Sequence, residues 1–306
     1  SLEFYNKKTK DLIWSYPVSS FIYPFGSIQA NVGEITNNGI EFTLNAIPVK
    51  TKDFEWNTTL NLAHNSNKVD RLSNDLYHTG TFSQGDPMVA GVSANGYTQR
   101  VMEPIGTFYM YEFAGYNDAG KATYYVHDAT TNARTGEVTE TPVYKDRTIV
   151  GNAQPKLSLG WNNTLNYKDW TLTMFFTGVF GNKIYNGSRA QYNAPDMFSG
   201  GKNVLKEFIY DRPYTDTYSN VPSTRYLEKG DYFRLQSLTL GYTFRHFNGW
   251  LQSMQLYLTC NNLFTLTGYK GLDPEVNLGG IDPGVDYRWS HYPHTRTFMI
   301  GAKVNF

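Results

Sequence analysis

The sequence lacks three features that would point to other classes of protein. Cys260 is its only cysteine, which excludes an internal disulfide framework and any zinc site built from several cysteines. No uninterrupted apolar run approaches the ~20 residues that a membrane-spanning helix requires. The 27 basic and 27 acidic side chains cancel, so the chain has no excess of positive charge of the kind that binds nucleic acids.

Charged residues of both signs are also scarce, whereas aromatic residues are abundant. Charged residues make up 18% of the chain, against roughly 25% in ordinary soluble domains, and aromatic residues make up 16%. Aromatic rings favour membrane–water interfaces and stacking surfaces. The mean hydropathy is −0.47, a value that a membrane β-barrel tolerates because only every second residue of its strands faces lipid.

Apolar and polar side chains alternate in many segments of about the length that a tilted membrane-spanning strand needs. In residues 155–167, Leu159 and Trp161 alternate with polar residues such as Asn162, and residues 295–306 alternate up to a terminal phenylalanine. Successive side chains of a strand point to opposite faces, so each such strand has an apolar and a polar face. A soluble sandwich can show the same alternation, but its repetition at this length favours a barrel in lipid.

Ten segments are predicted to be strands. They are residues 2–13, 38–49, 54–67, 104–116, 122–128, 155–167, 170–181, 231–244, 253–264 and 295–306. The eighth is irregular, because Phe233 and Leu235 share a face with Thr239 and Thr243, and this predicts either a β-bulge or inward apolar contacts. Aromatic residues near the short connections, such as Phe54 with Trp56, Tyr167 with Trp170 and Phe244 with Trp250, are interpreted as an interfacial girdle.

Short and long connections alternate between these strands. The short ones lie near residues 50–53, 117–121, 168–169 and 245–252, and the long ones near 14–37, 68–103, 129–154, 182–230 and 265–294. In an up-and-down barrel this alternation places all long loops at one rim, which is the outer rim of outer-membrane barrels. With an even number of strands, Leu2 and Phe306 both lie at the opposite, periplasmic rim. The predicted fold is therefore an all-β, transmembrane antiparallel β-barrel with long extracellular loops.

Three strings near the C-terminal end stand out, YFRLQSLTLGYTF at 232–244, LYLTCNNLFTLTGYKGLDPEV at 256–276 and YPHTRTFMIGAKVNF at 292–306, and further strings lie upstream at 37–46, 103–125 and 151–186. All of them resemble one known family, the SusC-like (SusC/RagA) TonB-dependent outer-membrane transporters of Bacteroidetes. The specific signal is Asn-Leu-Phe-Thr followed by Tyr-Lys-Gly-Leu-Asp-Pro-Glu, whereas a terminal phenylalanine alone is a weak one. The family-motif positions are therefore Tyr269, Lys270, Gly271, Asp273, Pro274 and Glu275, with Phe306.

The resemblance implies a 22-stranded barrel, of which residues 1–306 supply about ten C-terminal strands. It also implies TonB-dependent import of a bulky nutrient, together with a SusD-like surface lipoprotein. An oligosaccharide is the first expectation for the cargo, and oligopeptides are the alternative. No segment resembles the family's plug domain or TonB-contacting box, so energy coupling is assigned to no residue here. No signal peptide precedes the first strand, and we interpret the chain as a fragment.

No catalytic constellation stands out, so we expect neither an enzyme nor a metal or cofactor site. His291 and His294 lie three apart, but this spacing does not place both rings on one face of an extended segment, and no carboxylate is in register. Asp273 and Glu275 are interpreted as turn residues at a strand exit. A complete ten-stranded barrel enzyme and a non-transporting adhesin remain as alternatives from other functional classes.

The candidate ligand residues lie in the long loops. Tyr185 and Tyr192 belong to a loop rich in Tyr, Asn, Asp and Arg, and Tyr287, Arg288 and Trp289 form a second polar and aromatic group. Aromatic rings beside hydroxyl and amide groups suit the apolar face of a sugar ring, and they equally suit a protein lid. The sequence leaves both alternatives open.

Overall fold

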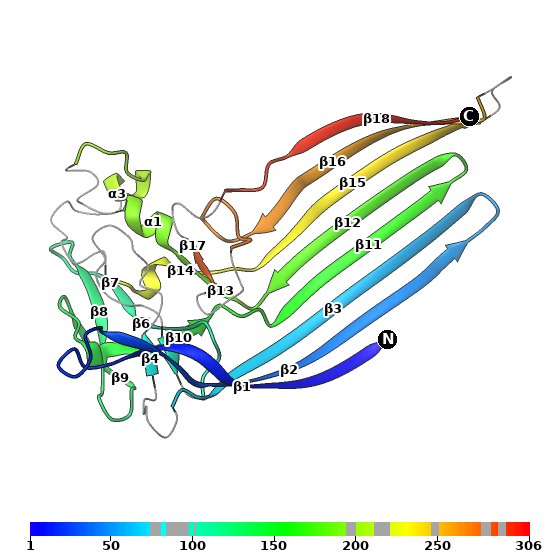
Figure 1. Ribbon diagram of the computed structural model, residues 1–306. Helices are drawn as coiled ribbons and strands as arrows, with labels where there is room; N and C mark the ends of the chain where they lie inside the picture. Colours follow the sequence, from blue (N-terminus) through cyan, green and yellow to red (C-terminus); the bar gives the residue numbers. More distant parts are fainter. Residues whose placement is uncertain are drawn as a thin grey trace.

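One large antiparallel sheet dominates the computed structural model, which describes residues 1–73, 81–83, 98–100, 102–193, 200–210, 221–245, 251–276, 283–286 and 292–306 (Figure 1). This sheet, the wall, has eight strands in the order β1-β2-β3-β11-β12-β15-β16-β18. They are β1 (Leu2–Pro17), β2 (Ser27–Lys50), β3 (Phe54–Arg71), β11 (Leu157–Tyr167), β12 (Trp170–Phe180), β15 (Tyr232–Arg245), β16 (Ser253–Thr267) and β18 (Thr297–Asn305). Every wall pair is antiparallel.

The described residues contribute eight wall strands, so the predicted count of ten is wrong. β3 pairs directly with β11, and the described residues between these two strands form one excursion away from the wall. The predicted strands at 104–116 and 122–128 lie in this excursion as β6 (Thr107–Tyr111), β7 (Phe113–Tyr116) and β8 (Ala122–His127). β6 is buried at four of its five positions, which does not fit a strand with one wet face. Conversely, most of the predicted long connection at 14–37 is strand, because β1 and β2 extend to a turn at 18–26.

The register places apolar side chains in continuous rows across the wall. One row runs through Val49, Trp56, Leu165, Leu172, Leu240, Leu258 and Ile300. A row on the opposite face runs through Asn45, Thr59, Asn162, Phe175, Ser237, Asn261 and Thr297, and is polar except at Phe175. Directly paired residues share a face of the sheet, so the wall has one apolar and one polar face, as the alternation predicted.

The predicted irregularity of β15 is confirmed. Phe175 and Phe176 of β12 pair with Ser237 and Leu235, so Gln236 is an extra residue on β15 against β12, and the register against β16 also shifts between Leu235 and Ser237. Because of this bulge, Phe233 and Leu235 share the apolar face with Leu238 and Leu240, and Thr239 turns to the polar face.

The two ends of the wall differ. At the tight-turn end, short connections at 51–53 and 168–169 join neighbouring strands, and both chain termini lie at this end (Figure 1). Aromatic rings gather there, with Trp170 and Tyr242 at 4.8 Å and Tyr242 and Phe244 at 4.7 Å between ring centroids. Trp250, which was predicted to join this girdle, lies outside the described residues.

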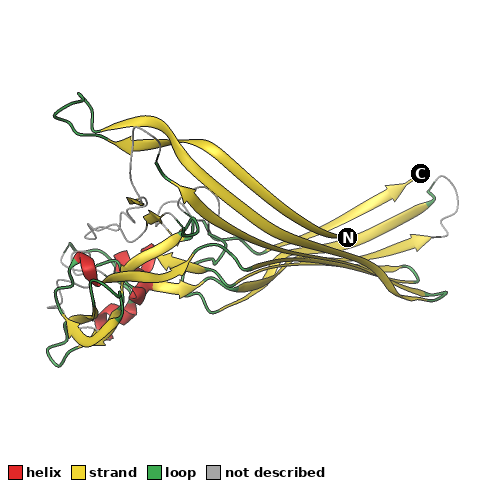
Figure 2. Cartoon of the chain, turned by 90° about the horizontal axis from the view of Figure 1, so that it is seen from below, coloured by secondary structure: helices red, strands yellow, loops and turns green. Residues whose placement is uncertain are grey.

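The loop end carries smaller elements that gather beside the wall (Figure 2). Among the described residues these are β4 (Thr81–Ser83), β5 (Thr98–Arg100), β9 (Arg134–Thr139), β10 (Arg147–Asn152), β13 (Lys183–Asn186), β14 (Leu227–Lys229), β17 (Val285–Asp286), α1 (Gly187–Tyr192), α3 (Lys206–Tyr210) and the 3-10 turns Tyr144–Asp146 and Thr224–Tyr226. A core of Phe108, Met110, Ala153, Tyr185, Ala190, Tyr226 and Val285 holds several of them together. Over the described residues, no helix has the length and apolar character needed to cross a membrane.

Two glycines of the wall allow close approach of a tyrosine ring from the neighbouring strand. A Cβ at Gly39 would lie 2.1 Å from the Tyr5 ring, and a Cβ at Gly301 would lie 2.3 Å from the Tyr257 ring. Both tyrosines therefore lie flat over cross-strand glycines on the polar face, an arrangement that fixes register.

Candidate functional site

Three short strands at the loop end bring distant loops to one place. β13 pairs with β14 in antiparallel fashion and with β17 in parallel, so the connections β12–β15 and β16–β18 meet in one small sheet. Directly after β13, Asn186 caps α1, since its side chain accepts a hydrogen bond from the Arg189 amide at 2.8 Å. This cap fixes the direction in which α1 leaves the sheet.

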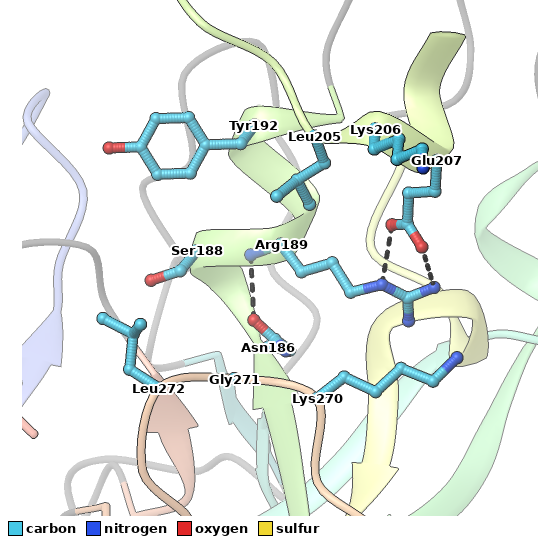
Figure 3. A pocket seen from close by; sticks show the side chains of 10 residues that line it. All are labelled: Asn186, Ser188, Arg189, Tyr192, Leu205, Lys206, Glu207, Lys270, Gly271 and Leu272. Atoms are coloured by element: carbon cyan, nitrogen blue, oxygen red, sulfur yellow. Dashed lines mark hydrogen bonds and ion pairs between the residues drawn. The ribbon is translucent and has the colours of Figure 1, made fainter. Parts of the chain in front are cut away.

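Arg189 joins α1 to α3 and β14. Its guanidinium donates to both carboxylate oxygens of Glu207, at 2.7 and 2.8 Å (Figure 3). It also donates to Glu228 at 2.9 Å. Burial raises the pKa of Glu207, but the hydrogen bonds and positive charge of Arg189 outweigh this effect and leave that pKa below its usual value. A bidentate pair of this kind has a defined geometry, so it holds the two short helices in fixed positions.

A cavity of about 520 Å³ lies beside this pair (Figure 3). It is lined by Asn186, Ser188, Arg189, Tyr192, Leu205, Lys206, Glu207, Lys270, Gly271 and Leu272. The lining combines apolar surface from Tyr192, Leu205 and Leu272 with charged and hydrogen-bonding groups. Such a mixture can bind an elongated organic molecule that has both apolar and polar parts.

The segment that carries the family resemblance forms one side of this cavity. The buried Tyr269 hydroxyl donates to Asp286 at 2.6 Å, and the Lys270 amide donates to Glu228 at 2.7 Å. Burial and the neighbouring Asp286 carboxylate raise the pKa of Tyr269 far above its ordinary range, so this phenol stays protonated as a donor. Through these hydrogen bonds, Tyr269 connects the last long loop to β17 and Lys270 connects it to β14.

The same segment continues into a charge cluster on the polar face of the wall, in which Arg234 and Asp273 are buried and Glu275 and His294 are exposed. Arg234, only 2% exposed, donates to Asp273 and to Glu275 at 2.6 Å each. His294 donates its amide to Asp273, and its Nδ1 lies 2.9 Å from the same carboxylate. Burial opposes the ionisation of Asp273, but the hydrogen bonds from the Glu275 and His294 amides, the His294 ring and Arg234 lower its pKa to about 2.

Asp273, Glu275 and His294 also form a group whose ligand atoms lie within 4.8 Å of one another. Arg234 already donates to both carboxylates, so a metal ion would have to displace a buried guanidinium. The arrangement therefore fits a structural role. We call Arg234, Asp273, Glu275 and His294 the latch, because their hydrogen bonds connect β15 to the last long loop. The sequence did not reveal this contact, because His294 is 21 positions from Asp273.

The candidate ligand residues proposed from the sequence lie in different environments in the structure. Tyr192 lines the cavity, whereas Tyr185 is 1% exposed and packs in the loop-end core. Tyr287, Arg288, Trp289 and His291 lie outside the described residues. Pro274 is buried and separates Asp273 from Glu275 in the sequence, and Phe306 follows β18 at the tight-turn end.

A second cavity, of about 490 Å³, lies where β3 and β11 meet the loop-end elements. Amide, hydroxyl and charged side chains predominate among its lining residues, which include Asn65, Ser66, Asn67, Asn152, Gln154, Lys156 and Lys183. Lys183 donates to the Val150 carbonyl at 2.6 Å, and burial lowers its pKa. This site offers many hydrogen-bonding groups to a polar ligand, and sequence reasoning did not identify it.

Comparisons with known proteins give the wall a family context, although no family model matches the chain. The whole chain aligns at 30% identity with TonB-dependent receptor P3 of Formosa agariphila and at 25% with TonB-dependent receptor SusC of Bacteroides thetaiotaomicron. These alignments cover 32% and 30% of the two relatives, so the chain spans about a third of their length. A solved structure titled "Structure of the RagAB peptide transporter" matches the whole chain with a TM-score of 0.80 at 22% identity, over 33% of that chain.

These relatives confirm the resemblance to SusC-like TonB-dependent receptors, and the structural match confirms the barrel-wall fold. The relatives are receptors and transporters rather than enzymes, in agreement with the prediction from sequence. TonB-dependent receptors are outer-membrane proteins, so the predicted placement in the outer membrane is confirmed. Over the described residues the wall is an open sheet with β1 and β18 at its two edges.

Proposed function

We propose that this chain, which is related over its whole length to SusC-like TonB-dependent receptors, is the C-terminal part of the barrel of a TonB-dependent importer. Residues 1–306 form one barrel-wall domain with its outer loops. The observation that carries the proposal is the division of the wall into continuous apolar and polar rows at membrane-spanning length. The apolar face contacts lipid, the polar face lines a hydrated interior, the loop end faces outside, and Phe306 lies at the periplasmic rim.

The proposed cargo is a bulky nutrient, and an oligosaccharide is the first candidate. The polar face offers amides and hydroxyls such as Asn45, Asn162 and Asn261, and the second cavity offers Asn67 and Gln154. Such groups both donate and accept hydrogen bonds, as the hydroxyl groups of a sugar require. Import would use energy from the TonB complex through parts of the protein outside this chain, and a SusD-like surface lipoprotein would cover the loop end.

Oligopeptides are the second candidate cargo. The cavity beside Arg189 places Leu205 and Leu272 close to charged side chains, a lining that suits the mixed side chains of a peptide. The structurally similar RagAB is titled a peptide transporter. Both observations support a peptide cargo, and neither argues against an oligosaccharide.

Uptake by cells that carry the full-length protein tests the proposal. We expect a deletion strain to lose growth on one class of nutrient, and we expect the same loss when TonB is depleted. Mass spectrometry of ligands retained by the protein purified under mild conditions identifies the cargo as glycan or peptide. Unchanged growth of the deletion strain on every nutrient tested, together with a protein that retains no ligand, would contradict import.

A further inference from the structure

A third cavity, of about 490 Å³, lies on the apolar face of the wall near the tight-turn end, and we call it the lateral groove. Strands β12, β15, β16 and β18 contribute its lining, which includes Trp170, Leu240, Tyr242, Phe244, Leu256 and Ile300. None of its described lining residues carries a charged or an amide side chain, in contrast to the two cavities at the loop end. The lateral groove therefore suits an apolar ligand.

The lateral groove has two raised sides. Trp170, Tyr242 and Phe244 form one side, and their ring centroids follow one another at 4.8 and 4.7 Å. Ile300 of β18, which is 86% exposed, forms the other side, and β16 runs between them with Leu256 opposite Tyr242. β15 and β18 are two strand spacings apart, or about 10 Å between backbones. That distance leaves room for an alkyl chain, whereas an α-helix with its side chains is about 10–12 Å wide.

Positive charge lies just beyond the tight-turn end of the lateral groove. Lys168 and Asp169 form the two-residue turn that precedes β12, and Arg245 ends β15. The Arg245 guanidinium pairs with Asp169 at 2.9 Å, so these three residues together keep one net positive charge. The Lys168 ammonium lies 5.4 Å from the centre of the Tyr167 ring. Aromatic rings of a barrel mark the level of the lipid headgroups, and a cation at this level complements a lipid phosphate.

The lateral groove stays accessible when the rest of a barrel is added. Further wall strands would pair with the sheet edges β1 and β18, in the plane of the sheet. A domain that fills the interior would lie against the polar face. Neither addition covers the apolar face of β12, β15 and β16, which is the face that the proposed function places in the membrane.

We propose that the lateral groove binds one phospholipid of the periplasmic leaflet. One acyl chain lies between the aromatic side and Ile300, and the headgroup phosphate lies beside Lys168 and Arg245. This inference rests on the proposed function, which places the apolar face in lipid, and it goes further because it assigns one lipid to one site. The acyl chain contacts both β16 and β18, so the bound lipid stabilises the pairing of these two strands.

The test counts the lipids that bind to the full-length transporter. Delipidated protein is titrated with phosphatidylethanolamine that carries one palmitoyl and one oleoyl chain, and native mass spectrometry should show one lipid that binds before all others. Leu256→Trp fills the lateral groove with an apolar ring, so we expect this first lipid to bind at least about 10-fold more weakly, as for the lost burial of about two methylene groups. Leu44→Trp is the matched control, because Leu44 is 44% exposed on the apolar face of β2 and Leu256 is 42% exposed. This control should bind the lipid as the unaltered protein does.

The headgroup contact is tested separately. We expect Lys168→Gln to weaken binding of the first lipid about 2- to 5-fold, which is the range for an exposed ion pair. Lys52→Gln, in the neighbouring tight turn, is the control and should have no effect. Diacylglycerol with the same two chains lacks the phosphate, so its binding should not respond to Lys168→Gln. Equal phospholipid binding by the two lysine variants would overturn the headgroup assignment.

Two results would overturn the lateral groove as a lipid site. One is a lipid count that rises without a first saturable step, or that is equal for Leu256→Trp and Leu44→Trp. The other is a transporter dimer that Leu256→Trp dissociates, which would assign the lateral groove to a second copy of the chain. Growth of the deletion strain tests import independently of the lipid count. A transporter that imports its nutrient without a saturable lipid therefore contradicts only this inference, whereas loss of import from the proposal leaves the lipid count to be judged by itself.

Discussion

The indole Nε1 of Trp56 donates a hydrogen bond to the Asn163 side-chain oxygen at 3.0 Å, between β3 and β11 on the apolar face of the wall. Next to it, the indole of Trp161 donates to the Thr58 hydroxyl at 2.9 Å. Two polar side chains thus lie within the apolar rows, and each accepts a hydrogen bond from an indole, although the Asn163 amide nitrogen has no partner. Asn163 is only 3% exposed, although it lies on the outer face. In a hydrocarbon environment such partners are necessary, because an unsatisfied polar group cannot bond to water.

We expect Trp56→Phe to destabilise the barrel by about 1–3 kcal/mol, because it leaves the Asn163 oxygen without its donor in an apolar environment. Denaturant unfolding of the full-length protein in detergent measures the effect. Adding Asn163→Leu should recover most of the loss, since the double variant leaves no unpaired group. A double variant no more stable than Trp56→Phe alone would contradict this account.

The alternation of side chains predicted the wall well, because strand facing is a local property with a period of two. Leu159, Trp161 and Asn162 occupy the predicted faces, and the bulge near Leu235 follows from the break in the pattern. The number of wall strands was wrong because residues 107–111 are locally strand-like but pair with β10 instead of the wall. Pairing is decided by distant partners, which a short apolar segment does not specify.

The loop-end site was less predictable for the same reason. Arg189 meets Glu207 and Glu228 across 18 and 39 positions, and Arg234 meets Asp273 across 39. Such contacts arise from the meeting of several loops, and no sequence spacing signals them. The resemblance marked Tyr269 to Glu275 as notable, and the structure shows the interactions that these residues form.

A matched pair of substitutions tests the facing of β3. Leu60 lies on the apolar face and its neighbour Asn61 on the polar face. We expect Leu60→Arg to reduce assembly of the full-length barrel, because an arginine facing lipid near the midplane costs about 2–4 kcal/mol. Asn61→Arg should assemble normally, since its side chain enters the hydrated interior. Surface levels and heat-dependent electrophoretic mobility measure assembly, and equal tolerance of both variants would reverse the assigned faces.

Arg234→Met should release the latch that holds the last long loop. The substitution leaves Asp273 as a buried charge that has lost its guanidinium, a change that typically costs about 3–5 kcal/mol. Hydrogen exchange of residues 270–276 should rise markedly, and exchange in β11 should remain unchanged. Lys121→Met is the control, because its ion pair with Glu140 is largely exposed and such pairs contribute about 0–1 kcal/mol. Equal exchange in both variants would show that the latch is not stabilising.

The same latch predicts how the loop responds to acid. The pKa of Asp273 is lowered from 3.8 to about 2 in the folded protein, so its ionisation stabilises the fold above pH ~4, and this contribution is lost as the pH falls from there toward 2. Proteolysis by an acid-active protease should therefore cut residues 270–276 increasingly over this interval. Asp273→Asn removes the titrating group, so its loop should be cut at a rate that depends less on pH after correction for the protease itself. An identical pH profile for both proteins would assign the transition to another carboxylate, and Glu275, which shares Arg234, would be the next to replace.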